Sequence, residues 1–277
     1  DLDGAVIGQA LAITEGARIA GLLRMTFARV GTNVDLTGGN FDSVDLTGTT
    51  IGAEIRLASR GYAAIDWQPA ARLVLRNVSA KALQDLPEAW PTTLDLEGFT
   101  YERLGGYRES ESNDVAARDS QSFIDWLAKQ PQYSPQPYRT LADVLRAAGF
   151  PQKAKEVLYA GYLREWHGLS GLAWFWQAMR WAIIGFGLYP QRSALWILFL
   201  VPLGAFIFSF EPQVRLRAMR PTDRLIYSLD ALLPFVTLRQ EHNAFDLQSW
   251  PKYYLYFHKV MGYVLIGFLL SAVTALG

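Results

Sequence analysis

Three histidines, His167, His242 and His258, are the residues of this 277-residue chain best suited to metal or proton chemistry. Their spacing contains neither an i, i+4 pair nor the H-E-x-x-H pattern that holds zinc on one helix face. Glu241 and Asp246 could complete a metal site with His242, and His167 or His258 could ligate a haem iron at a membrane boundary. Interfacial histidines without a metal are the commoner case, so we predict no cofactor and no metal.

Other catalytic signatures are missing from the sequence. No G-x-G-x-x-G follows a predicted strand, and Gly185-Phe186-Gly187 lies in an apolar stretch. The chain has no cysteine, which excludes disulfides, zinc–thiolate sites and a cysteine nucleophile. The nucleophile elbow G-x-S-x-G is also missing. We therefore predict a protein without catalytic residues.

Charged and aromatic residues near the C-terminus are the remaining candidates for function. An ionisable residue in or near a membrane is a functional candidate by default, and Asp230 is such a residue. A local ion pair of Asp230 with Arg224 or Arg239 is the alternative, and we favour it. His242, Trp250 and His258 complete the set of candidate functional or interaction positions.

Two apolar stretches predict that the last third of the chain lies in a membrane. Residues 193–210 and 260–276 carry no charged side chain and approach the ~20 residues that a crossing helix needs. Pro202 inside the first stretch is tolerated in membrane helices. Aromatic residues between Lys252 and Lys259 resemble the aromatic belt at a membrane surface. A buried core helix of a soluble protein is the alternative for each stretch.

A third apolar stretch, residues 172–188, contains Gln177 and Arg180 and either spans the membrane or lies in its interface. The arginine-rich segment 215–224 follows the first clear span and should therefore be cytoplasmic. Three spans would place the N-terminal domain in the cytoplasm, and two spans would place it on the opposite side. We expect three membrane segments and a cytoplasmic N-terminal domain.

Residues 222–233 have the pattern of an amphipathic helix between two predicted spans. Pro234 should end this helix. In pore-loop channels such a helix leads into a filter of backbone carbonyls, but residues 233–240 contain no glycine-rich filter and carry Arg239. We prefer a helix that lies at the membrane surface or between subunits. A re-entrant helix in an ion-conducting homo-oligomer is the alternative.

A repeat of about 11 residues occupies the first part of the chain and begins at Ile7, Ile19, Val30, Phe41 and Ile51. Each unit continues with two apolar residues in strand-like alternation and a glycine or small polar residue that permits a turn. Stacked units of this kind form a β-solenoid, whereas a β-sandwich would have longer strands. We predict a right-handed, pentapeptide-like β-solenoid over residues 1–105.

The remaining segments connect this solenoid to the membrane. The chain begins within a unit, so we expect further repeats before Asp1, and residues 83–90 are expected to cover the other end. Residues 106–118 are polar and predict a linker. Three helical patterns over 119–167 predict a rigid stalk. The predicted membrane domain covers residues 168–277.

The C-terminal region resembles a known group of proteins. The stretches YSLDALLPFVTLRQ, Trp250-Pro251 and HKVMGYVLIGFLLSAVTAL resemble the membrane module of bacterial membrane-bound proteins with pentapeptide-like repeats. YRTLADVLRAAG resembles the segment before that module. The resemblance covers most of the chain, is specific at 221–276, and implies a bacterial inner (cytoplasmic) membrane location. The group has no settled function, and the label "membrane-associated oxidoreductase" that some members carry has no support among these residues.

These observations predict a noncatalytic, membrane-anchored scaffold or docking protein, an accessory subunit of a larger membrane assembly. Its expected partners are other membrane protein subunits and lipid, with a soluble partner on the solenoid face. Equal numbers of basic and acidic residues, 26 of each, argue against binding to nucleic acid. The ion-conducting homo-oligomer remains the alternative.

Overall fold

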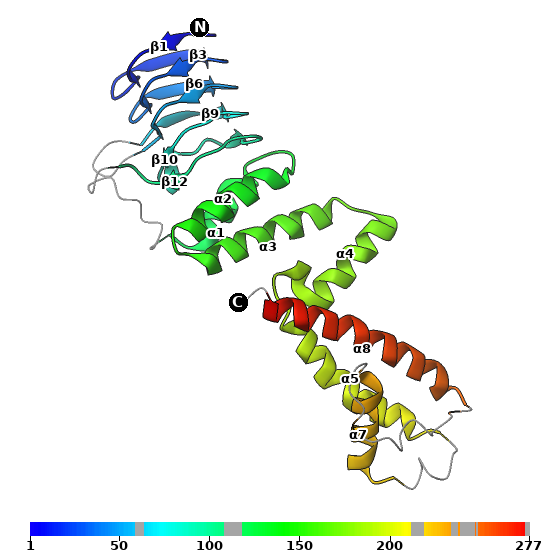
Figure 1. The fold of residues 1–277 in the computed structure, drawn as a ribbon. Helices are drawn as coiled ribbons and strands as arrows, with labels where there is room; N and C mark the ends of the chain where they lie inside the picture. Colours follow the sequence, from blue (N-terminus) through cyan, green and yellow to red (C-terminus); the bar gives the residue numbers. More distant parts are fainter. Residues whose placement is uncertain are drawn as a thin grey trace. The chain divides into compact units, whose positions relative to one another are not determined.

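Two compact units divide the chain, unit 1 over Asp1–Gly168 and unit 2 over Leu169–Gly277. The structure is a computed structural model that describes residues 1–58, 64–107, 118–211, 219–233, 238, 247 and 249–274. Unit 1 begins with a β-solenoid of about four turns, and the described residues after it contain seven α-helices (Figure 1). The predicted solenoid is thus confirmed.

Three parallel sheets form the sides of the solenoid. The first contains β1 (Val6–Ile7), β4 (Arg29–Val30) and β7 (Thr50–Ile51). The second contains β2 (Leu11–Ala12), β5 (Val34–Asp35), β8 (Glu54–Arg56), β10 (Ala82–Gln84) and β12 (Arg103–Leu104). The third contains β3 (Arg18–Arg24), β6 (Asn40–Asp45), β9 (Asp66–Val74) and β11 (Thr93–Asp95). Such short strands cannot bury an apolar face alone, so stacking stabilises them.

One coil of the solenoid contains two of the 11-residue units that the sequence shows. Val34 pairs with Leu11 in the coil before and with Ile55 in the coil after, at separations of 23 and 21 residues. Val44, from the next unit in the sequence, pairs with Leu23 in a different sheet. Val34 and Val44, which belong to successive units of the repeat, therefore lie in different sheets. They are buried on different sides of the same core.

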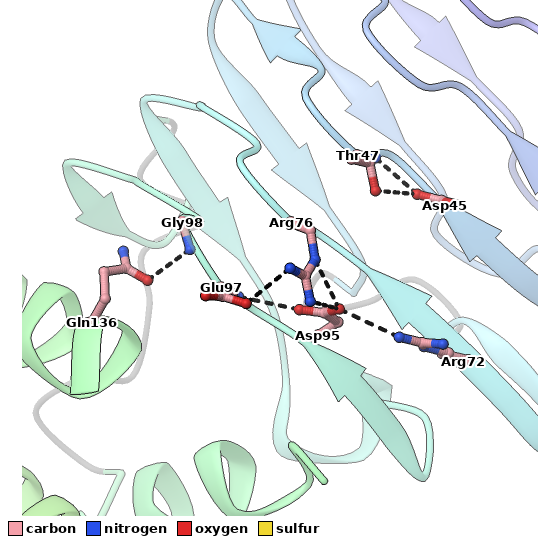
Figure 2. A network of polar contacts seen from close by, with 8 residues as sticks. All are labelled: Asp45, Thr47, Arg72, Arg76, Asp95, Glu97, Gly98 and Gln136. Atoms are coloured by element: carbon pink, nitrogen blue, oxygen red, sulfur yellow. Dashed lines mark hydrogen bonds and ion pairs between the residues drawn. The ribbon is translucent and has the colours of Figure 1, made fainter. Parts of the chain in front are cut away.

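Aspartate residues fix the corners of the coils. Asp45 Oδ1 accepts hydrogen bonds from the backbone N–H of Thr47 at 2.9 Å and from its hydroxyl at 2.6 Å (Figure 2). Asp35 and Thr37 repeat this arrangement in the coil's other half. Gly48 follows with a φ of +69°, a conformation that other residues rarely adopt.

Three helices of unit 1 close the C-terminal end of the solenoid: α1 (Ser120–Ala128), α2 (Pro135–Ala147) and α3 (Pro151–His167). A short 3₁₀ helix, η1 (Pro87–Ala89), precedes them. Phe123, Leu141 and Val157 from the three helices belong to the same hydrophobic core as the solenoid leucines. The segment that we expected to form a stalk therefore packs on the solenoid as a helical cap. Residues 83–90, expected to cover this end, instead contribute β10 and η1 to the solenoid region.

Helices fill unit 2: α4 (Gly171–Ile184), η3 (Gly185–Gly187), α5 (Arg192–Phe208), α7 (Pro221–Leu232) and α8 (Pro251–Thr274). Helices α5, α7 and α8 each contact the other two. Helix α7 ends before Pro234 as predicted and starts one residue before the predicted 222–233, with Pro221 at its first position. Helix α8 begins at Pro251, so the aromatic segment 252–259 belongs to the helix that we expected to start at residue 260.

One described helix, α8, is long and apolar enough over Pro251–Leu270 to cross a membrane. Helix α5, which coincides with the span expected at 193–210, has 17 residues and measures about 26 Å. The third expected span, 172–188, is not a continuous helix. Helix α4 has 14 residues and ends at Gly185, where three successive residues have positive φ. Its length of about 21 Å is too short for the ~30 Å hydrocarbon core.

Candidate functional site

Helix α8 buries one narrow face and exposes the rest of its surface. Its buried positions, Pro251, Leu255, His258, Gly262 and Leu265, follow the alternating spacing of four and three residues typical of a helix–helix seam. Apart from Lys259 and Gly267, the exposed residues of this helix are large and apolar or aromatic, and they include Tyr253, Tyr256, Phe257, Val260, Tyr263 and Leu270. The seam therefore contains a histidine and a glycine while apolar side chains cover the outer surface.

Glycines bring the three helices of unit 2 into close contact. A methyl group on Gly262 of α8 would lie 1.8 Å from the carbonyl oxygen of Leu232 at the end of α7. A methyl group on Gly204 of α5 would lie 2.2 Å from Ser228 Oγ on α7. Small residues permit this approach, which is the common way in which helices pack inside membranes.

His258 lies at the centre of these contacts and is fully buried. Its Nε2 is 3.0 Å from the carbonyl oxygen of Ser228 and 3.2 Å from Ser228 Oγ. Phe208 of α5 meets the imidazole edge-on, with ring centres 5.9 Å apart, and Tyr254 flanks it at 5.3 Å. A carbonyl can only accept, so Nε2 carries the hydrogen that is donated to Ser228. Within the described residues Nδ1 has no hydrogen-bond partner.

Axial haem ligation does not fit the surroundings of His258. The nitrogen that would bind iron, Nε2, is engaged by Ser228. Gly204 packs so closely on this side of the ring that even a methyl group there would lie 3.0 Å from Cε1. His167, the other histidine considered, is exposed at the end of α3 in unit 1. We therefore derive no chemistry from a haem group.

A second buried polar contact lies in unit 2 around Glu211, which is 1% exposed. Its Oε2 accepts a hydrogen bond of 2.6 Å from the hydroxyl of Ser249. Burial raises the pKa of Tyr227 to about 12, and the carboxylates of Glu211 and Asp230 act in the same direction. A deprotonated tyrosine is therefore excluded at neutral pH, so Tyr227 contributes a neutral hydroxyl and a buried ring.

The predicted interaction residues occupy different positions in unit 2. Asp230 is half-buried, and its Oδ1 accepts a hydrogen bond of 2.7 Å from the backbone N–H of Leu238. Arg224 is half-buried in α7, and Trp250 is exposed with its ring 6.1 Å from that of Phe210. Arg239 and His242 lie outside the described residues, as do Glu241 and Asp246.

The large exposed apolar side chains of unit 2 extend over helices α4, α5 and α8. On α4 they include Leu172, Trp174, Phe175 and Trp176, and on α5 they include Leu195, Leu198, Phe199 and Phe206. Monomeric soluble proteins rarely expose apolar patches of this extent. A surface of this kind fits lipid tails or another apolar protein surface.

Sequence analysis singled out His258 but missed its partners. Ser228 and Gly204 lie on other helices, and their sequence separation gives no signal of the contact with His258. The sequence feature that could have indicated such a helix contact is a small or polar residue inside an apolar helix, such as Ser193 or Gly204. Described residues contain no group of three or more His, Asp or Glu side chains arranged to hold a metal ion.

Comparison with known proteins adds no further assignment. No protein-family model, curated protein or solved structure matches this chain. Of the resemblance to bacterial pentapeptide-like-repeat proteins, the part that the structure bears out is the β-solenoid. Fold and site together define a β-solenoid protein with a helical C-terminal region that has apolar residues outside and polar residues within its helix contacts.

Proposed function

We propose that the chain is a noncatalytic, membrane-anchored docking protein and an accessory subunit of a larger assembly in the bacterial inner membrane. In this proposal unit 2 is the anchor, and unit 1 presents its solenoid and helical cap to a partner protein. The observation that carries the proposal is the distribution of residues in unit 2. His258, Ser228 and two glycines occupy the helix contacts, while tryptophan, tyrosine, phenylalanine and leucine face outward.

The distribution favours a lipid environment over the core of a soluble protein. A core helix of a soluble protein is mostly buried, whereas 17% of the apolar window in α8 is buried. In water an outer surface of this composition would promote association, but in lipid it has no such cost. The hydrogen bond of His258 within the seam removes its ring N–H from the hydrocarbon, as an intramembrane polar group requires.

The topology follows from which helices cross the bilayer. We place α5 and α8 across it and α4 in the interface, because α4 is short and exposes three tryptophans, Trp174, Trp176 and Trp181. The arginine-rich segment 215–224 between the two crossing helices is then cytoplasmic. Two crossings place unit 1 on the opposite face of the membrane. This replaces the cytoplasmic location that three spans would have given.

Single cysteines test the anchor directly because the chain has no cysteine of its own. We would attach a nitroxide at L198C and Y263C, with A12C in unit 1 as the matched exposed control. In liposomes we expect oxygen to relax the two labels in unit 2 strongly and a water-soluble nickel complex to relax them weakly. Nickel accessibility at both positions equal to that of A12C would refute the membrane anchor.

Docking is tested by purification of the full chain from native membranes in mild detergent. We expect a complex that contains this chain and at least one other protein in fixed stoichiometry, visible by single-particle microscopy. A symmetric ring of this chain alone would refute the accessory-subunit proposal. Ion flux through liposomes that contain such a ring would then support the conducting homo-oligomer.

A further inference from the structure

The helical cap closes one side and one corner of the last solenoid coil. The backbone N–H of Leu94 in β11 donates to the carbonyl of Lys129, which follows α1, at 3.2 Å. At the next corner the backbone N–H of Gly98 donates to Gln136 Oε1 of α2 at 2.9 Å (Figure 2). Gln136 Nε2 donates to the carbonyl of Phe99, also at 2.9 Å. These groups provide the contacts that a further coil would otherwise make.

Another side of the same coil, strand β12, faces a groove. Arg103 and Gly105 donate their backbone N–H groups to Lys81 and Leu83 of the preceding coil. In a parallel sheet alternate residues bond to opposite neighbours, so the N–H and C=O of Leu104 point away from β10. A cavity of about 280 Å³ lies there between β12 and α2. Among the described residues, strand β12 is thus the last strand of its sheet and borders an open space.

Buried apolar side chains form the floor of the groove, and two alanine side chains form part of its wall. Leu104, Val144 and Leu145 are buried and line it, while Ala147 and Ala148 at the end of α2 are exposed. Within this sheet each coil contributes one inward aliphatic side chain, and they stack in the order Leu11, Val34, Ile55, Leu83 and Leu104. The groove lies where the next aliphatic side chain of this column would lie.

The rim of the groove carries two exposed charged residues, Glu102 and Arg103, and Arg103 is the one directly before Leu104. Arg103 is exposed, and its guanidinium lies 5.1 Å from the centre of the Tyr107 ring. In a parallel register the occupant's residue directly before its aliphatic side chain lies beside Arg103. An acidic residue occupies the equivalent register position two strands earlier, where Glu54 of β8 aligns with Ala82 of β10. Opposite charges side by side on neighbouring strands stabilise the pairing.

We propose that the groove between β12 and α2 binds an extended segment of a partner protein, which adds to β12 as a parallel strand. The segment carries an acidic residue directly before a leucine-like residue. Main-chain hydrogen bonds to Leu104 provide affinity, and the apolar pocket and Arg103 provide specificity, as in other cases of strand addition. The inference rests on the proposed docking function and names its site and the chemistry of its partner.

The test is the binding of a defined peptide to the full chain in detergent, followed by fluorescence anisotropy. The probe is a fluorescein-labelled peptide that copies residues 79–86 of this chain with the change A82E. We expect saturable binding. Because a tryptophan at residue 147 fills the groove, A147W should weaken binding at least about tenfold. The matched control A128W changes an exposed alanine of α1 that does not line the groove and should leave binding unchanged.

Two further probes separate strand addition from nonspecific adhesion. N-methylation of the amide after the peptide's leucine removes the donor that should reach the carbonyl of Leu104, so binding should be lost. R103E should weaken binding by about fivefold, and a peptide with lysine in place of the glutamate should restore it. No saturable binding at millimolar peptide, or equal affinities for A147W and A128W, would overturn the proposal.

The outcome for the site is distinguishable from the outcome for the general docking function. A fixed-stoichiometry complex from native membranes that persists in A147W would keep the docking function and refute the β12 site. Peptide binding that depends on Ala147, Arg103 and the backbone amide would support the site even if the chain purified without another subunit. That second result would refute the accessory-subunit proposal only.

Discussion

Gln136 replaces a further coil at one corner of the solenoid, and its removal should have a predictable cost. One turn earlier, the backbone N–H of Asn77 donates to the carbonyl of Glu97 in the last coil at 2.8 Å, and the carbonyl of Val78 accepts from the backbone N–H of Thr100 at 2.9 Å. The equivalent groups of the last coil bond to the carboxamide of Gln136, which both accepts and donates. The side-chain amide thus acts as a peptide group that ends the stack.

Q136A leaves two backbone groups of the last coil without their partner. An unsatisfied buried group costs about 1–3 kcal/mol, and because this corner is half-buried we take the lower limit for each. The expected loss is about 2 kcal/mol, which is about a 30-fold change in the ratio of closed to open corner.

Q136E separates the two hydrogen bonds. The carboxylate can still accept from Gly98 but cannot donate to the carbonyl of Phe99. The unfavourable contact raises the pKa of the introduced carboxyl above its usual value of about 4.3. Protonation restores a donor, so the stability that Q136E lacks at pH 7 should return as the pH falls through this raised pKa.

Hydrogen–deuterium exchange of the full chain in detergent measures the effect at the site itself. Peptides that contain residues 96–101 should exchange about 30-fold faster in Q136A than in the parent chain under conditions where exchange follows opening. Q132A is the matched control, because Gln132 is an exposed glutamine shortly before α2. Equal exchange in Q136A and Q132A would refute the role of Gln136 as a replacement for a peptide group.

Three further predictions concern the two cores. G262A should lower the thermal stability of unit 2, with a cost of about 1–3 kcal/mol from overpacking at the end of α7. G267A is its control, since nothing lies within 4 Å of a methyl group there, and equal melting temperatures in detergent would contradict the close contact. Y101F should keep or raise stability at pH 7, because the buried hydroxyl of Tyr101 has no hydrogen-bond partner among described residues. Burial raises the pKa of Tyr101, so the parent should lose stability above about pH 10, where the unfolded chain ionises, and Y101F should lose less in alkaline urea titrations. V44D should abolish the protease resistance of unit 1, whereas S43D on the partly exposed face should retain it.

Local patterns predicted the elements of unit 1 well but not how they stack. Alternating aliphatic residues and corner glycines gave the strands, and Pro151 and Gly149 marked a helix start and end that the structure confirms. The sequence did not show that two 11-residue units form one coil, because both halves of a coil carry the same aliphatic spacing. Only long-range pairing distinguishes them, and no local signal in the sequence encodes it.

Predictions failed where a tertiary contact determines where an element packs or ends. The helical cap looked like a separate stalk because its apolar faces could equally pack on one another. Their packing against the last coil depends on Gln136 and on the shape of the exposed end. Gly185 and Gly187 in the sequence indicate the break in this segment. The predicted span ran on to residue 188 because it was based on hydropathy alone.

The candidate site in unit 2 illustrates why apolar periodicity loses its value in a membrane segment. In a soluble helix the apolar face marks the buried side, because the opposite face must be polar. In α8 both faces are apolar, and the buried seam is marked by His258 and Gly262. Small and polar residues at a spacing of three or four are therefore the signal that identifies the seam. The same reasoning applies to α5, whose buried positions include Ser193 and Gly204 while Leu195, Leu198 and Phe199 face outward. Polar residues in the seams of both helices are the pattern expected when the outer solvent is lipid, since lipid tails provide no hydrogen-bond partner for a histidine or a serine.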